Sequence, residues 1–165
     1  MALVTKAIKP KTLNVEGMMA ALTKAANEVA DEMVVDFAFT TATWKHQPKF
    51  ERLVQVGPDQ IAILVGTDDE IYGYVNDGTR PHPIYPKRAK RLRFQPVYTA
   101  KTVPGSMTSR AGGPSGPFVY SMGVQHPGTQ PRNFDEKIEK ETKPRFKSRM
   151  EQAMREARKA SGHAI

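Results

Sequence analysis

The sequence contains no cysteine among its 165 residues. Disulfides, thiolate metal sites and cysteine nucleophiles are therefore excluded, and nothing in the chain demands an oxidising compartment. No apolar run approaches the length of a membrane span, and residues 1–10 have no apolar stretch like that of a secretory signal. We therefore expect a soluble protein that is made in the cytoplasm and has no membrane partner.

No complete catalytic motif is present either. The glycine-rich segment 112–116 is not followed by the Gly-Lys-Ser/Thr of a phosphate-binding loop, and no nucleophile elbow surrounds any serine. The adjacent acids Asp68, Asp69 and Glu70 fit the first turn of a helix better than a cation site. We therefore expect no enzymatic activity and no cofactor.

The histidines raise one metal hypothesis. None of the four lies at the helical spacing of metal ligands with another: His46, His82, His126 and His163. His82 and His126 each stand next to a proline and could meet in space. Asp77 or Asp135 would then complete a site. A polar turn residue beside proline is the simpler interpretation, so the sequence predicts no metal.

Charge is unevenly distributed along the chain. Residues 1–79 hold 7 Lys/Arg and 11 Asp/Glu, whereas residues 80–165 hold 18 and 6, for a net charge of +8. This asymmetry suggests one acidic and one basic surface. Two kinds of partner fit it: nucleic acid on the basic side, or a neighbouring copy whose opposite face meets it head to tail and closes a ring.

Apolar periodicity predicts a long helix towards each end of the chain. Apolar residues recur at helical spacing over about residues 15–39, and Asn14 is a suitable N-cap. A second helical stripe follows residues 133–136, which resemble a capping box. Pro144 should kink or restart this last helix, and Gly162 should end it.

The middle of the chain has the patterns of strands. Residues 50–56 and 60–65 flank a Gly-Pro-Asp turn, and the second is apolar on both faces, as in a central strand. The basic strand 87–94 and the strand 118–124 enclose a Gly/Pro-rich loop, residues 101–117, as in a long hairpin. The sequence thus predicts one α+β domain over residues 14–162, with a small, mainly antiparallel sheet, two long helices and a protruding hairpin loop. Residues 1–13 form a basic N-terminal arm.

The rest of the chain is organised around residues 72–134. Two Gly-Thr corners, each next to a His-Pro, bracket the basic strand and the loop. Together with three glycines of the loop they are the candidate subunit or partner interface: Gly78, Thr79, His82, Gly105, Gly112, Gly113, His126, Gly128 and Thr129. The basic strand supplies the candidate DNA-facing residues, Arg88, Lys90, Arg91 and Arg93, which suit phosphate contact without sequence readout. A solvated or subunit-facing strand is the alternative.

Three short motifs follow one another in residues 74–134. They are Tyr-Val-Asn-Asp-Gly-Thr at 74–79, Pro-Lys-x-x-Lys-x-Leu-x-Phe at 86–94 and His-Pro-Gly-Thr-x-x-x-x-Phe at 126–134. With the flanking helices, the layout of residues 15–160 resembles the small neck, or tail-completion, proteins of long-tailed bacteriophages, which are also called minor tail or head–tail joining proteins.

The resemblance implies a structural virion protein without enzymatic activity. It implies a homo-oligomeric ring, with six-fold symmetry expected, at the junction of the head connector and the tail tube. The expected neighbours are tail-terminator and head-closure proteins. A separate hypothesis, which rests on the arginines of one strand face, is that they line a channel and attract DNA without reading its sequence. Such a protein is made in the cytoplasm of the bacterial host and ends in the virion neck. The alternative is a non-specific nucleic-acid-binding protein.

Overall fold

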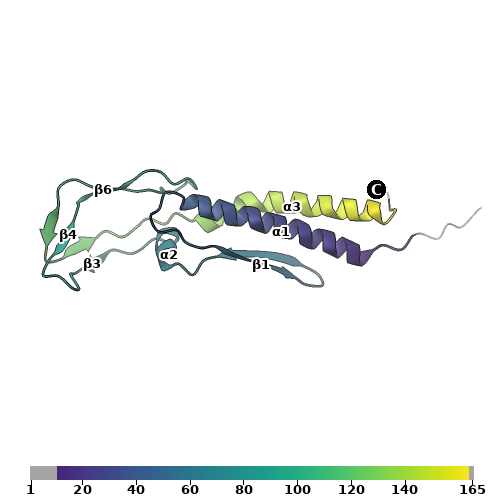
Figure 1. The fold of residues 1–165 in the computed structure, drawn as a ribbon, viewed down its shortest axis with the longest axis horizontal. Helices are drawn as coiled ribbons and strands as arrows, with labels where there is room; N and C mark the ends of the chain where they lie inside the picture. The colour runs from purple at the N-terminus through teal and green to yellow at the C-terminus, as the bar shows by residue number, and fades with distance from the viewer. Residues whose placement is uncertain (1–10, 164–165) are drawn as a thin grey trace, which may run out of the picture.

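The computed structural model describes residues 11–163 and shows an elongated α+β molecule (Figure 1). Two long helices, α1 (Val15–Thr40) and α3 (Phe134–Ala160), lie side by side and run in opposite directions. A two-stranded hairpin lies along α1. An extended ribbon projects beyond the end of the helix pair where α1 ends and α3 begins. The predicted basic N-terminal arm, residues 1–13, falls outside the described part for its first ten residues.

Both long helices form where the periodicity predicts them. The side chain of Asn14 accepts a hydrogen bond from the Gly17 backbone N–H at 2.9 Å, which confirms its role as the N-cap of α1. The last helix neither stops nor restarts at Pro144, because α3 continues through this residue to Ala160. Gly162 adopts a φ of +78° just beyond that end. Within residues 11–163, no helix combines the length and the apolar character needed to cross a bilayer.

Arginines of α3 and β1 neutralise the acidic side of α1. Arg145 pairs with Asp36 at 2.6 Å and with Glu32 at 3.3 Å. Further contacts join Arg149 to Glu28 and Glu32, and Arg52 to Asp31. Each such partly exposed pair contributes only about 0–1 kcal/mol. The expected acidic surface is therefore not formed along this side of α1, because the basic half of the sequence folds onto it.

The core lies where both helices meet the short helix α2 (Glu70–Asn76). Phe37, Tyr72, Phe134 and Ile138 form one buried cluster, against which Trp44, Phe50 and Met107 pack. The ring of Tyr72 is central, with its centroid 5.0 Å from that of Phe50 and 5.9 Å from that of Phe134. This aromatic cluster fixes α2 against the start of α3. It therefore fixes the point from which the ribbon leaves the body, by which we mean the three helices, the β1–β2 hairpin and the segments that join them.

The expected central strand is an edge strand. β2 (Ile61–Gly66) pairs only with β1 (Glu51–Val56) in the described structure, across the predicted Gly-Pro-Asp turn. One face of this hairpin packs on α1, whereas Leu53 and Leu64 on the hairpin remain about half exposed. The prediction failed because an apolar residue on each face of a strand does not specify how many neighbours the strand has.

The ribbon consists of three nested antiparallel pairs. β3 (His82–Ile84) pairs with β8 (Val124–His126), β4 (Leu92–Phe94) with β7 (Val119–Ser121), and β5 (Val97–Thr99) with β6 (Gly113–Ser115). An isolated bridge between Thr79 and Thr129 closes its base. We call residues 79–129 the arm. Of the predicted basic strand 87–94, only Leu92–Phe94 is a strand, and residues 87–91 form bends. Its predicted pairing with the strand after the loop is confirmed, although the strands form separate two-stranded sheets instead of one sheet.

The predicted protruding hairpin loop is not confirmed. Instead, the end of the arm folds back onto the body, where Lys101 Nζ donates to the Thr43 carbonyl oxygen at 2.6 Å. Thr43 also donates from its backbone N–H to Ser109 Oγ and from its hydroxyl to the Arg110 carbonyl. Met107 joins the edge of the core cluster. The loop is therefore held by the body, and the arm encloses a hollow instead of extending freely.

Removing core volume at Ile138 should test this architecture. Ile138 is fully buried between α1 and α2, so Ile138→Ala should lower the free energy of unfolding by about 2–5 kcal/mol. The matched control is Val35→Ala on α1, because Val35 is 66% exposed and its truncation should cost less than about 0.5 kcal/mol. Urea denaturation followed by circular dichroism measures both. Equal, small effects would contradict the packing described here.

Candidate functional site: the base of the arm and its cationic ribbon

The two Gly-Thr corners meet at the base of the arm. Thr79 N–H donates to the Thr129 carbonyl at 2.9 Å, and Thr129 N–H donates to the Thr79 carbonyl at 3.1 Å. Thr129 N–H also lies 3.0 Å from Thr79 Oγ1. The structure thus brings together four of the predicted interface residues, Gly78, Thr79, Gly128 and Thr129, from positions fifty residues apart.

Both corner glycines are required because the two segments of the chain approach each other closely at the base of the arm. Gly78 and Gly128 have φ angles of +76° and +85°, which side chains other than glycine rarely adopt. A Cβ on Gly128 would overlap the Thr79 carbonyl oxygen, and one on Gly78 would lie 2.5 Å from the Thr129 carbonyl oxygen. These residues therefore build the base of the arm. The other predicted glycines, Gly105, Gly112 and Gly113, lie apart from them in the returning loop.

Asn76 caps the helix that follows the arm. Its Oδ1 accepts from the backbone N–H of Phe134 at 2.7 Å and from that of Asp135 at 3.4 Å, and its side chain is buried. The Asn76 carbonyl also accepts from Arg132 N–H and Asn133 N–H. The capping-box prediction at Asn133 is therefore wrong, since Asn133 adopts a left-handed φ of 50° and makes no side-chain cap. The cap comes from 58 residues earlier in the chain.

His82 and His126 do meet, as the metal hypothesis required. They are register partners in the β3–β8 pair, and their rings stack with centroids 5.0 Å apart. His82 Nδ1 contacts the Arg80 carbonyl at 2.8 Å, and Gly128 N–H donates to His126 Nδ1 at 3.0 Å. Across residues 11–163, no three His, Asp or Glu residues are grouped to hold a metal ion, so neither Asp77 nor Asp135 completes a site. Both rings instead support turns at the base.

The arm carries the whole net charge of the protein. Residues 79–129 contain eight Lys/Arg and no Asp/Glu, whereas the remainder of the sequence contains seventeen of each. The four predicted DNA-facing residues, Arg88, Lys90, Arg91 and Arg93, are all exposed, around and within β4. Leu92 and Phe94, which alternate with the more exposed Arg91 and Arg93, are half-buried. Both line the hollow inside the arm, as does Arg93. The arm is thus a cationic ribbon, and the rest of the sequence carries no net charge.

An aromatic surface accompanies these cations and was missed by the sequence analysis. Tyr120 is the register partner of Arg93, and the Arg93 guanidinium lies 3.7 Å from the ring centroid of Phe118. Phe118, Tyr120 and Met122 alternate along and beside β7, and each is more than half exposed. Their alternation in the sequence was the available signal. Without the register, it did not show that they stand beside Arg93.

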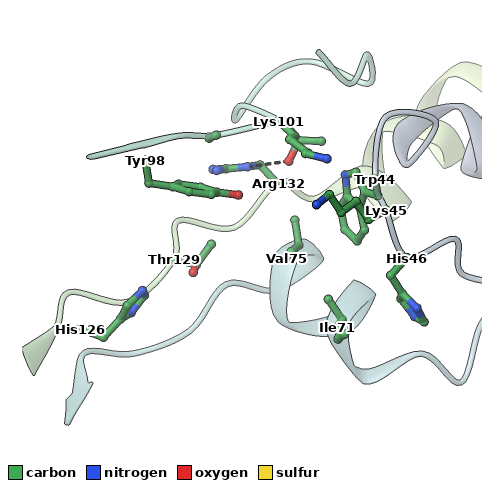
Figure 2. Close-up of a pocket in the computed structure, with 12 residues that line it drawn as sticks. Trp44, Lys45, His46, Ile71, Val75, Tyr98, Lys101, His126, Thr129 and Arg132 are labelled. Atoms are coloured by element: carbon green, nitrogen blue, oxygen red, sulfur yellow. Dashed lines mark hydrogen bonds between the residues drawn. The ribbon is translucent and has the colours of Figure 1, made fainter. Parts of the chain in front are cut away.

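A hollow lies between the base of the arm and the body (Figure 2). It has a volume of about 450 Å³ and is lined by Trp44, Ile71 and Val75 from the body and by Tyr98 and Arg132 from the arm side. A second hollow of about 910 Å³ lies inside the arm itself and shares five lining residues with the first: Tyr98, Ala100, His126, Thr129 and Arg132. The two hollows therefore adjoin at these residues.

Comparison with known protein families, with curated protein sequences and with solved structures finds no match to this chain.

The long-range cap predicts a specific loss of stability. Asn76→Ala should lower the free energy of unfolding by about 1–3 kcal/mol, because it leaves buried backbone donors of α3 without an acceptor. Asn133→Gly is the matched control: it should change stability by less than about 0.5 kcal/mol, because glycine suits the left-handed φ. Chemical denaturation compares the two variants. A larger loss at Asn133 than at Asn76 would restore the local capping box.

Proposed function

We propose that this chain is a neck, or tail-completion, protein of a tailed bacteriophage, a structural subunit that joins the tail to the head. The observation that carries the proposal is the convergence of the three motifs of the resemblance on one structural unit. Motif residues Asn76, Gly78, Thr79, Gly128 and Thr129 build the base, and the basic motif 86–94 lies on the arm that this base supports. An arm held so firmly at its base is suited to contacts with neighbouring subunits.

The exposed apolar surface of the arm supports an assembled state. Tyr85, Val97, Tyr98, Phe118, Tyr120 and Met122 are all more than half exposed. Two-stranded ribbons with open edges are at best marginally stable in water when nothing packs against them. Exposed aromatic, methionine and arginine side chains are also the residues enriched in protein interfaces. We propose a homo-oligomeric ring, expected to be hexameric, with tail-terminator and head-closure proteins as neighbours.

The neck proposal is tested in a phage that encodes this chain. Deleting the gene should give filled heads beside unattached tails in electron micrographs of the lysate, because the junction protein is missing. A plasmid copy of the wild-type gene should restore joined particles, whereas a folded Tyr120→Ser/Met122→Ser double variant should not, because it lacks two exposed contacts of the arm. Joined, infectious particles after deletion would refute the neck assignment.

Non-specific nucleic-acid binding is the second candidate, and the concentration of charge on the arm favours it. Phosphate contacts by Lys and Arg release counterions, so affinity falls with salt. Wild-type protein should therefore bind random duplex DNA with a strong salt dependence. Arg91→Gln/Arg93→Gln should weaken this binding and lower the slope of log K against log salt by about two, given roughly 0.9 for each phosphate contact.

The control for this experiment changes the same amount of charge elsewhere. Lys140→Gln/Lys147→Gln removes two exposed cations from α3, outside the arm. It should leave the salt slope unchanged. An equal effect of both double variants would show that total charge, and not the arm, attracts the DNA; no binding by the wild type at low salt would remove this candidate.

A further inference from the structure

Arg132 is a buried cation that has no acidic partner among residues 11–163. Only 9% of its surface is exposed, and Nη1 donates to the Gln130 carbonyl at 2.9 Å. Nε makes a long contact of 3.4 Å with Thr102 Oγ1. In the described part of the chain, no carboxylate lies within ion-pair distance of its guanidinium. Burying a charge without a counter-charge is unfavourable, and this burial lowers the pKa of the Arg132 guanidinium.

The surroundings of Arg132 add positive charge. Lys45 and Lys101 line the same hollow, together with His46 and His126 (Figure 2). The nearby carboxylate of Asp69 is already engaged, because it contacts His46 and accepts from the Tyr72 N–H at 2.8 Å as the N-cap of α2. These contacts hold the pKa of Asp69 below its usual range. The hollow therefore has a positive electrostatic potential that no free acid of its lining offsets.

The rest of the lining is largely apolar. Trp44, Ile71 and Val75 border the hollow on the body side, and Leu92, Phe94 and Val124 border the adjoining hollow inside the arm. Sites of this kind, apolar with a few convergent polar groups, bind ligands that combine an apolar part with a polar anchor. A phosphate ion, which is strongly hydrated and carries no apolar part, suits this lining less well than a carboxylate on an apolar carrier.

We propose that the hollow beside Arg132 is a binding site for a carboxylate carried on an apolar group. The planar guanidinium binds a carboxylate through parallel N–H donors, and Lys45 adds attraction at the rim. The carrier packs against Trp44, Ile71 and Val75. Either a small organic acid or an Asp or Glu side chain in a partner's extended segment presents this chemistry. The inference does not depend on the neck proposal.

The protein contains its own reporter for this site. Trp44 is the only tryptophan of the chain, and it lines the hollow. Its fluorescence and its indole N–H resonance should therefore respond to occupancy. Titration of the full-length protein with phenylacetate should give a saturable change. Phenylacetamide, which has the same shape but no charge, should bind about tenfold more weakly, because it lacks the charge-assisted hydrogen bonds.

Variants assign the response to the proposed anchor. Arg132→Met should weaken phenylacetate binding about tenfold or more. Lys45→Gln changes an exposed rim residue and should weaken phenylacetate binding about threefold. This second variant keeps the test decisive even where Arg132→Met does not fold. Arg91→Met removes an arm cation that lines neither hollow and should have no effect. An equal loss of phenylacetate affinity in Arg91→Met and Lys45→Gln would overturn the site assignment.

Further probes identify the source of the carboxylate. If acetyl-Phe-Asp-Phe-amide binds more tightly than phenylacetate, and acetyl-Phe-Asn-Phe-amide does not, the ligand is an acidic segment of a protein. If phenylacetate binds more tightly than the Asp peptide, the ligand is a small acid; both results support the site. A Trp44 response to inorganic phosphate alone, or to none of these probes at millimolar concentration, would overturn the proposal.

Discussion

The hydrogen bonds of Asn76 hold the structure together at the point where the arm joins the body. Asn76 is the last residue of α2, and its side chain caps the start of α3. Its backbone carbonyl fixes the segment just beyond the second Gly-Thr corner. The Thr79–Thr129 bridge lies immediately beyond it. The two limbs of the arm leave the body at a spacing that these bonds set, so the positions of the cationic ribbon and of the hollow both depend on them.

The elements with local signals were predictable from the sequence. The apolar period and the Asn14 cap gave both ends of α1 within one or two residues, and the Gly-Pro-Asp turn placed the β1–β2 hairpin. The pairing of the basic strand with the strand after the loop also followed from their order. In the first two cases the deciding interaction joins residues that are close in sequence, or a pattern of side chains that repeats along one element.

The features that were missed depend on residues far apart in sequence. The cap at Phe134 comes from Asn76, and the loop is held by Thr43, which no local pattern connects to residue 101 or 109. Asn133 has the composition of a cap but a backbone conformation that prevents it from serving as one. For the candidate site, the absence of acidic residues over 79–129 was visible in the sequence. The burial of Arg132 beside Thr102 was not visible in the sequence, because this burial requires the loop of the arm to fold back onto the body.

The segregation of charge limits how copies of this protein can meet. A two-fold contact between two arms would bring together two sets of eight positive charges with no acid on either side, and such like-charge contacts are costly at low ionic strength. The rest of the sequence, with equal numbers of acids and bases, offers no comparable barrier. Electrostatic repulsion therefore disfavours symmetric arm-to-arm dimers and leaves polyanions, or acidic protein surfaces, as the surfaces that the arm can approach.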